Sequence, residues 1–293
     1  MRTGLQHWDS MCAGCGYEAG ALEPGINDTA AHGQLDERQR EAGLKATRVE
    51  SFRQIVELIL QLRGGRGGSL LDVGSAHGWF LEQARRVFEV QGIEPDNQVR
   101  AEALKRGLPV RGGYFPFALD QTETFDVISF NDVIEHIPDI GAALRACNER
   151  LNEGGLLVLN LPNSGGLFYR LSALLARYGW KAPFSRLWQQ GLPSPHVHYF
   201  NSGNLTTLVE RHGFVLAACT QIAAVRARGL WQRLACDRNT RGAGLYLQYA
   251  GVLCAVPLLR LFQSDIIVCI FRRAAPLEAA TPGGRRAEQA AVA

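Results

Sequence analysis

The sequence lacks three features that would assign it to particular classes of protein. Its 31 Lys and Arg nearly balance its 28 Asp and Glu, so the net charge of +3 gives no electrostatic case for binding nucleic acid. Its seven cysteines are an odd number scattered mostly in apolar runs, which argues against a disulfide framework and for a reducing compartment. No apolar stretch follows Arg2, so we expect no signal peptide and a cytoplasmic location.

Apolar runs and helical patterns alternate over most of the chain. Short runs predict strands at 69–73, 90–94, 108–111, 125–130 and 155–160, with helices between them. Further runs predict a sixth strand at 214–219 and a seventh at 266–271. This order favours an α/β fold, a Rossmann-like doubly wound sheet of seven strands that is mostly parallel.

The remaining segments divide the chain around this domain. We expect residues 1–45 to be an irregular N-terminal segment, 46–273 to be the α/β domain, and 274–293 to be a disordered tail. Two insertions interrupt the domain, at 163–200 and at 220–262. No internal repeat is evident.

A glycine-spaced turn follows the first predicted strand, in the run LLDVGSAHGWF. Gly74 would allow a tight turn after Asp72, and Gly78 would let the backbone approach a ligand closely. The spacing G-x-x-x-G differs from the G-x-G-x-x-G of dinucleotide-binding proteins, so a pyrophosphate is not the expected ligand. Glu94 ends the second strand, where a carboxylate can accept hydrogen bonds from two ribose hydroxyls. Together these residues predict a sugar-bearing cofactor without a phosphate bridge.

At this point the sequence resembles the class I S-adenosylmethionine (SAM)-dependent methyltransferases, in the small-molecule branch that includes ubiquinone-pathway O-methyltransferases. The resemblance rests on LDVGSAHG at 71–78, GIEPD at 92–96, and FDVISFNDVIEHI at 125–137. It implies SAM as cofactor and an antiparallel last strand. The residues it implies for SAM binding are Asp72, Gly74, Ser75, Gly78, Glu94, Pro95, Asn131 and Asp132.

The sequence departs from the pattern of this family at two points. Ala76 stands where a middle glycine is usual, and the acid that often contacts adenine is not evident after the third strand. On the resemblance we still expect Glu94→Ala to weaken SAM binding at least tenfold and to leave the fold intact.

His136 is the leading candidate for a general base, with Glu135 beside it. A hydroxyl acceptor usually needs a base, and histidine titrates near neutral pH. The alternative is that both residues orient the loop or bind cofactor without proton transfer. His196 and His198 face the acceptor or chelate a metal, and the lack of a paired acid nearby in the sequence disfavours a metal.

The predicted function is methyl transfer from SAM to a small-molecule or glycan- or lipid-linked acceptor, at oxygen. The alternatives are a nitrogen or carbon acceptor, and a non-catalytic SAM-binding scaffold of the same fold. No nucleic-acid partner is expected.

Three attached features are open to two interpretations each. Cys12 and Cys15 have the spacing of half a zinc ribbon, with His7 and His32 as further candidate ligands, or they are free thiols of a vestigial ribbon. The uncharged stretch 242–259 forms a hydrophobic helix of the protein or a peripheral membrane contact. Aromatic residues of the first insertion form a lid on the acceptor pocket or a structural cap: Phe168, Tyr169, Tyr178, Trp180, Phe184 and Trp188.

Overall fold

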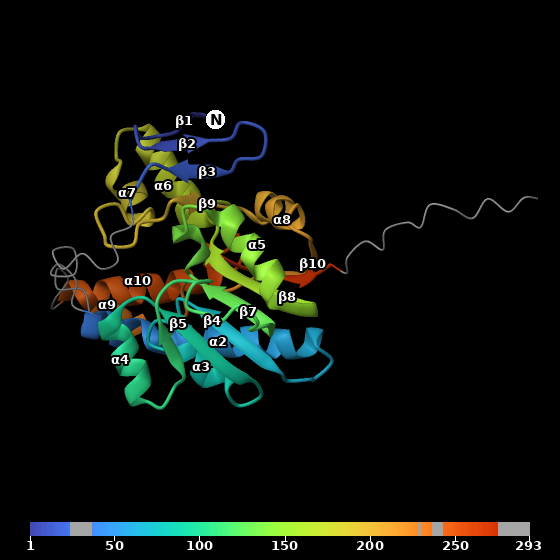
Figure 1. Ribbon diagram of the computed structural model, residues 1–293. Coiled ribbons are helices and arrows are strands. Elements are labelled where there is room, and N and C mark those ends of the chain that lie inside the picture. The colour runs from blue at the N-terminus through green and yellow to red at the C-terminus, as the bar shows by residue number, and fades with distance from the viewer. Residues whose placement is uncertain (24–36, 228–229, 236–242, 275–293) are drawn as a thin grey trace, which may run out of the picture.

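The computed structural model describes residues 1–23, 37–227, 230–235 and 243–274 (Figure 1). Its larger part is a sheet with helices on both faces, and a smaller sheet lies at the top of the view. The tail that the sequence predicts to be disordered, 274–293, lies outside the described residues except for Ala274.

The central sheet has the seven strands that the sequence predicts. They are β4 (Ser69–Val73), β5 (Glu89–Glu94), β6 (Val110–Gly112), β7 (Phe125–Asn131), β8 (Leu151–Pro162), β10 (Phe214–Gln221) and β11 (Ile266–Arg273). Their order is β10-β11-β8-β7-β4-β5-β6. The pairs β4–β5, β4–β7, β5–β6 and β7–β8 are parallel, and β11 is antiparallel to both neighbours. The predicted Rossmann-like α/β fold is confirmed.

Helices bury both faces of this sheet because its strands are apolar on both sides. Helices α2 (Glu37–Leu62), α3 (Trp79–Ala84) and α4 (Asn97–Lys105) supply the core on one face, and α5 (Ile140–Arg150) and α8 (Ser202–Glu210) on the other. The neighbours Leu70 and Leu71 of β4 are both fully buried, and each belongs to a different one of the two cores. Successive side chains of a strand point to opposite faces, so a strand covered on both sides must be apolar throughout.

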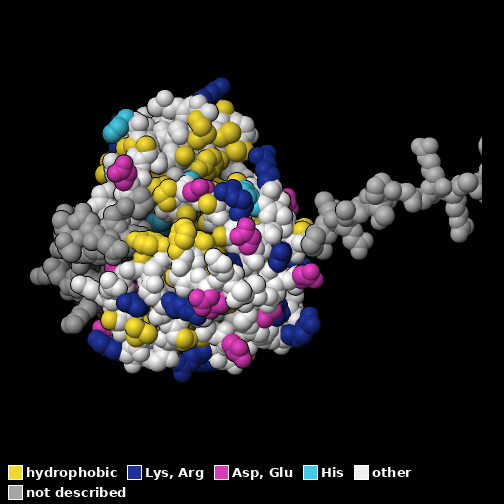
Figure 2. All heavy atoms as spheres, in the orientation of Figure 1, with side chains coloured by type: hydrophobic (Ala, Val, Ile, Leu, Met, Phe, Trp, Pro, Cys, Tyr) yellow, Lys and Arg dark blue, Asp and Glu magenta, His cyan; other side chains and the backbone are white. Residues whose placement is uncertain are grey.

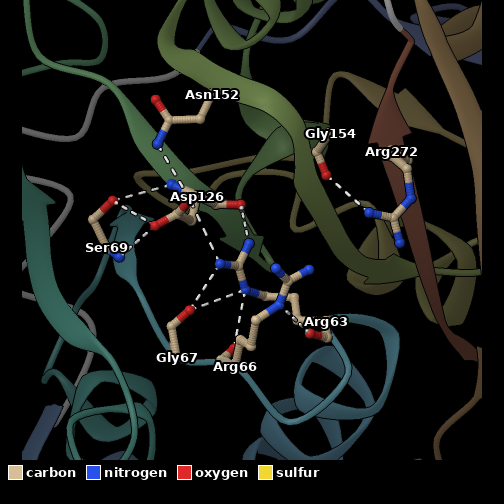
Figure 3. A network of polar contacts seen from close by, with 8 residues as sticks. All are labelled: Arg63, Arg66, Gly67, Ser69, Asp126, Asn152, Gly154 and Arg272. Atoms are coloured by element: carbon tan, nitrogen blue, oxygen red, sulfur yellow. Dashed lines mark hydrogen bonds and ion pairs between the residues drawn. The ribbon is translucent and has the colours of Figure 1, made fainter.

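A polar network lies at the amino-terminal ends of β4 and β7, the edge of the sheet opposite the glycine-spaced turn that follows β4 (Figure 3). The Asp126 carboxylate accepts a hydrogen bond from the Ser69 amide at 2.9 Å and one from the Asn152 side chain at 3.2 Å. Arg63, just after α2, lies 3.5 Å from the same carboxylate and donates to the carbonyl of Gly67 at 2.7 Å. The network thereby ties the end of α2 to the first residues of β4 and β7.

The N-terminal segment is not irregular as predicted. It contains β1 (Arg2–Thr3), β2 (Asp9–Met11) and β3 (Glu18–Gly20), and β3 pairs with β9 (His198–Tyr199) to complete a four-stranded sheet. Residues 37–45, also predicted to be irregular, belong to α2. Sequence patterns missed these strands because each has two or three residues and the partner of β3 is remote in the chain.

The first insertion forms α6 (Leu167–Arg177) and α7 (Ala182–Leu187), which pack on the small sheet. Tyr169, Phe184 and Trp188 are buried there against Trp8 and Tyr199. These three aromatic residues therefore form a structural cap. Phe168, Tyr178 and Trp180 remain exposed. Figure 2 shows apolar side chains gathered toward this upper part, with both charge signs interspersed below.

The second insertion forms α9 (Leu230–Ala235) and α10 (Ala243–Leu259). Helix α10 contains no charged residue and is apolar around its whole circumference, yet several of its large side chains face solvent, including Tyr246, Leu247 and Leu258. Among the described helices, none is both long enough and apolar enough to cross a membrane.

Candidate active site

The loop after β4 adopts left-handed backbone conformations that glycine permits. Gly74 has φ +66°, and Gly78, which precedes α3, has φ +73°. A Cβ atom on Gly74 would lie 2.6 Å from Cγ2 of Val133, and one on Gly78 would lie 2.4 Å from Cδ1 of Leu108. The sequence assigns Gly78 to close approach of a ligand. In the structure, packing against the protein's own side chains already requires glycine at both positions.

Glu94 fastens this loop to the end of β5. Its Oε2 atom accepts a hydrogen bond from the backbone N–H of Ala76, and its Oε1 atom accepts one from that of Asp96, both at 2.8 Å. Ala76 has φ +44°, a conformation that costs a residue with a Cβ atom about 1–2 kcal/mol. Burial raises the pKa of Glu94, and the two backbone donors oppose that shift. The carboxylate shapes the loop and keeps lone pairs for further donors such as ribose hydroxyls.

Asp72 lies buried between β4 and β7. Its Oδ1 atom accepts hydrogen bonds from the Ser129 hydroxyl at 2.8 Å and from the Asn131 amide at 2.9 Å. Asn160 of β8 in turn donates to the Asn131 side-chain oxygen at 3.3 Å. Burial raises the pKa of Asp72 to about 7, against the two hydrogen bonds, and the Glu94 carboxylate adds to the rise. Polar side chains of three neighbouring strands are thus fixed at the carboxyl edge of the sheet, where α/β folds bind ligands.

A small cavity of about 40 Å³ lies over this edge, and we call it the cofactor cavity. Its lining residues are Arg48, Phe52, Asp72, Gly74, Ser75, Ala76, His77, Trp79, Phe80 and Asn131. Helix α2 forms its roof, where Arg48 makes an ion pair of 3.0 Å with Asp132. Sites for small molecules usually measure about 300–1,000 Å³. A ligand as large as SAM therefore requires this cavity to open.

The residues that line the cofactor cavity, together with Glu94 beside them, suit SAM chemically. The Ser75 hydroxyl is buried and has no hydrogen-bond partner within the described part of the chain, so it can bind a polar ligand without losing a contact there. The Asp72 and Glu94 carboxylates can accept from the amino group and the ribose hydroxyls of that molecule. The residue set fits SAM, and the volume fits it only after opening.

The predicted SAM-binding residues divide into two sets. Those that line the cofactor cavity are Asp72, Gly74, Ser75 and Asn131, whereas Gly78, Glu94, Pro95 and Asp132 do not line it. Sequence reasoning missed Arg48 and Phe52. Their signal is a spacing of four residues on the helix before the first strand, which places both on one helix face. The binding role of each residue stays a prediction.

Glu135, His136 and His196 form a cluster next to this cavity, in which Glu135 and His196 are buried and His136 is half-buried. Oε1 of Glu135 lies 3.9 Å from Nε2 of His136 and 4.0 Å from Nε2 of His196. Nδ1 of His136 donates to the carbonyl of Pro195 at 2.8 Å, so the lone pair of the neutral ring is on Nε2. Nε2 of His196 accepts a hydrogen bond from Gln189 at 2.9 Å.

The electrostatics of the cluster follow from this convergence of acceptors. Among the residues that the structure describes, neither carboxylate oxygen of Glu135 has a hydrogen-bond partner. Burial raises its pKa well above the ordinary value, and the nearby Asp132 carboxylate raises it further. Burial, and then the neighbouring His136, lower the pKa of His196 to about 3. The lone pair on Nε2 of His136 and an oxygen of Glu135 lie 3.9 Å apart, so the two groups can share a proton. A divalent metal ion on all three residues would also need the His196 lone pair, which accepts from Gln189.

The structure separates His198 from this cluster. Tyr17 donates its hydroxyl to Nδ1 of His198 at 2.6 Å, and Nε2 of His198 donates to the carbonyl of Ile137 at 2.9 Å. Both ring nitrogens are therefore used in joining the N-terminal sheet to the loop after His136. His198 has a structural role, whereas His196 faces the carboxylate.

Cys12 and Cys15 lie at the turn between β2 and β3. The N–H of Gly16 donates to the carbonyl of Cys12 at 2.9 Å, and Gly16 has φ +69°. Backbone N–H groups of Cys15 and Gly14 lower the pKa of Cys12. No third Cys, His, Asp or Glu joins the pair in a metal-binding group within the described ranges, and His32 lies outside them. Zinc at Cys12 and Cys15 stays a prediction, which metal analysis of the purified protein would test.

A larger cavity of about 510 Å³ lies between α2, α6 and α10, and we call it the lateral cavity. The ends of β8 and β10 lead into its walls, so it shares the carboxyl edge of the sheet with the cofactor cavity. Apolar side chains from α6, α10 and the segment after α10 form much of the wall: Leu167, Phe168, Val256, Leu259 and Phe262. Arg226, Arg260 and Asp265 add charged groups.

Comparison with known sequences identifies the family of this chain. The family described as "Methyltransferase domain" matches residues 45–218. The ubiquinone biosynthesis O-methyltransferase of Paramagnetospirillum magneticum is 34% identical over 137 residues, which cover 44% of this chain and 55% of that protein. The protein of the same name from Caulobacter sp. is 30% identical over 186 residues, which cover 59% and 70%. The chain thus spans little more than half the length of the first of these relatives.

Solved structures match the fold at low sequence identity. A SAM-dependent methyltransferase of Thermotoga maritima, titled a possible histamine N-methyltransferase, gives a TM-score of 0.53 at 17% identity, covering 81% of this chain and 95% of that one. A cyclopropane synthase of Mycobacterium tuberculosis gives 0.52 at 16% identity, covering 74% and 83%. These likenesses concern the fold alone. The family match, the glycine turn and the carboxylates at the strand ends agree, and the chain belongs to the class I SAM-dependent methyltransferases.

Proposed function

We propose that the protein transfers a methyl group from SAM to a hydroxyl oxygen of a small molecule. The observation that carries this proposal is the Glu135–His136–His196 cluster beside the roof of the cofactor cavity. The names of the curated relatives, which are O-methyltransferases, support the choice of oxygen. When bound, SAM supplies a methyl group on a sulfonium, which is electrophilic without further activation.

The cluster would act as a base through one shared proton. When Glu135 is ionised, it and the neutral His136 together take up a single proton from the attacking hydroxyl; burial raises the pKa of Glu135, so this form gains population as pH rises. The hydrogen bond from Nδ1 of His136 to Pro195 fixes the ring so that Nε2 is the atom that accepts. His196 stays neutral at physiological pH because burial lowers its pKa, so it adds no competing positive charge. Such positioned proton transfer typically contributes about 10²–10⁴-fold to rate.

Measuring turnover and SAH affinity in the same variant distinguishes a catalytic role of His136 from a structural role. We expect His136→Ala to lose at least a hundredfold in turnover and to keep its affinity for S-adenosylhomocysteine (SAH), measured by calorimetry. The matched control is His7→Ala, because His7 is exposed in the N-terminal segment. Product SAH would be followed with phenols and sugar alcohols that do or do not carry alkyl chains. Normal turnover of His136→Ala would remove it from catalysis.

The same assay tests the alternative of a non-catalytic protein. If the wild-type chain binds SAH but forms no product with any acceptor, this result supports the interpretation as a non-catalytic scaffold. Glu135→Gln provides a second test because it keeps the shape of the side chain but cannot take up a proton. A shifted pH profile in that variant would support the shared proton, and an unchanged profile would contradict it.

The lateral cavity suits an acceptor with an apolar part, and we propose that it holds the tail of a lipid-linked acceptor. Its apolar wall comes from α6 and α10, and its volume lies within the usual range for ligand sites. Phe168 lines it from the first insertion. We expect Phe168→Ala to raise KM for tailed acceptors only, whereas equal KM changes for tailed and untailed acceptors would contradict this assignment.

We also propose that α10 contacts a membrane surface peripherally, as its uncharged stretch predicts. Leu247 is 75% exposed and Leu258 is 61% exposed, and with Tyr246 they give α10 an exposed apolar surface of the kind that marks interaction sites. Basic residues without any Asp or Glu among them occupy the nearby segment 166–190: Arg170, Arg177, Lys181 and Arg186. This charge suits anionic headgroups.

Vesicle sedimentation tests the membrane contact. Wild-type protein should sediment with vesicles of phosphatidylglycerol and phosphatidylcholine, and less with phosphatidylcholine alone. The double variant Leu247→Glu/Leu258→Glu should lose binding, while Phe117→Glu, at a residue 89% exposed elsewhere, should keep it. Equal sedimentation of all three proteins would refute the contact through α10.

A further inference from the structure

Two cysteines face each other across the edge of the central sheet. Cys219 of β10 and Cys269 of β11 are direct partners in the antiparallel register, and their sulfur atoms lie 3.1 Å apart. Opposed residues of antiparallel strands have Cα atoms about 4.5–5.5 Å apart, which lies inside the span of about 4.4–6.8 Å that disulfides bridge. The backbone therefore already has the spacing of a cross-strand disulfide.

The two thiols differ in access and in acidity. Cys219 is exposed on β10, the edge strand of the sheet, whereas Cys269 is buried in the core. The hydrogen bond from the Cys269 thiol lowers the pKa of Cys219 to about 7, against the effect of burial, and the pKa of Cys269 is raised. The exposed sulfur is thus the one that ionises near neutral pH, and the thiolate is the reactive form.

We propose that Cys219 and Cys269 form a thiol–disulfide exchange site for low-molecular-weight disulfides such as oxidised glutathione. The Cys219 thiolate attacks one sulfur of that molecule, forms a mixed disulfide and releases one glutathione thiolate. Cys269 then loses its proton and attacks the Cys219 sulfur, which releases the second glutathione. Two electrons pass from the cysteine pair to oxidised glutathione, which becomes two glutathione thiols.

The disulfide would form close to the lateral cavity, where the acceptor is proposed to bind. Gln221 ends β10 two residues after Cys219, lines the lateral cavity, and accepts a hydrogen bond from the Ser264 amide at 2.7 Å. The bridge closes a loop of 50 residues that includes α10, so it restricts the unfolded chain over that segment. We expect oxidation to raise the unfolding temperature by about 5 °C and to leave SAH affinity unchanged.

The experiment uses the full chain with the competing pair removed, as Cys12→Ser/Cys15→Ser. After treatment with oxidised glutathione, intact mass should fall by about 2 Da, and digestion should give a linked peptide containing both cysteines. Adding Cys219→Ser should abolish the link. Adding Cys254→Ser, which changes another exposed cysteine, should leave it intact.

Two results would overturn the proposal. One is a stable glutathione adduct on Cys219 that never resolves into the cross-strand bond. The other concerns the number of free thiols in the Cys12→Ser/Cys15→Ser protein, counted by alkylation without denaturant. The proposal fails if this number stays constant at the oxidant concentrations that oxidise the Cys12–Cys15 pair of the wild type. Circular dichroism of the Cys219→Ser variant would show whether it is folded, and its exposed position predicts that it is.

Discussion

Replacing Glu94 should weaken both the fold and cofactor binding, because its carboxylate has two tasks. Each oxygen accepts a backbone N–H at 2.8 Å, and hydrogen bonds to a charged group contribute about 1.5–3 kcal/mol each. Burial of the charge, which also raises the pKa of Glu94, offsets part of this sum. We therefore expect Glu94→Ala to lower the free energy of unfolding by about 2–3 kcal/mol. The sequence alone predicts an intact fold for this variant, and the structure revises that expectation.

Binding should fall for a separate reason. Without the bond to Glu94, the Ala76 N–H is no longer held, and the loop loses the arrangement that faces the ligand. We expect SAH affinity to fall at least tenfold, which is about 1.4 kcal/mol. Urea denaturation without ligand measures the first effect, and calorimetry with SAH at a temperature where the variant is folded measures the second.

Glu94→Gln serves as the matched variant. Its amide keeps the shape of the side chain and one acceptor oxygen, but its NH₂ group faces one of the two backbone N–H donors. We expect about half of the stability loss and a clear loss of affinity. Unchanged stability in both variants would refute the role of Glu94 in holding the loop, and unchanged affinity in folded protein would refute its role in the cofactor site.

Three further results are expected. Ala76→Gly should raise the free energy of unfolding by about 0.5–1 kcal/mol in urea titrations, because glycine relieves the left-handed conformation but is more flexible when unfolded. Asp126→Asn should make the free energy of unfolding depend less on pH in the acid range. Burial opposes ionisation of Asp126, but the Ser69 amide and other donors lower its pKa in the folded protein. Its contribution to stability is therefore present above the pKa of the unfolded state and is lost as pH falls through the pKa of the folded state. Arg48→Ala should speed SAH association in stopped-flow fluorescence, because it removes the ion pair with Asp132 that holds α2 over the loop; an unchanged rate would mean that the ion pair does not limit opening.

The central sheet could be predicted because each strand carries its own local signal. The run FDVISF and the run IIVCIF are apolar on both faces, so their strands are visible without knowledge of their partners. Boundaries are less visible: β8 begins at Leu151, four residues before its predicted start, because Leu151 pairs with Phe125 of β7. The register then shifts, and pairing with β7 resumes at Leu156, close to the predicted start.

The candidate site could be predicted only where its residues follow strands of the sheet. Asp72 and Asn131 end neighbouring strands, so the topology brings them together. His196 joins Glu135 from 61 positions away through an insertion without strong periodicity, and its role as third member of the cluster is set by tertiary packing. The spacing of His196 and His198 gave no basis for choosing which of them faces the carboxylate.

The small N-terminal sheet supports the segment that carries His196 of the proposed acceptor site. Strand β3 pairs with β9 through His198 and Tyr199, immediately after His196. The N–H of Val197 donates to the carbonyl of Glu135 at 2.9 Å, so the same short segment contacts both the sheet and the cluster. Because main-chain pairing on both sides fixes this segment, His196 can be held at 4.0 Å from a buried carboxylate without a helix or long strand of its own. The residues that precede the methyltransferase domain in the chain therefore help to build the place where its acceptor chemistry is proposed.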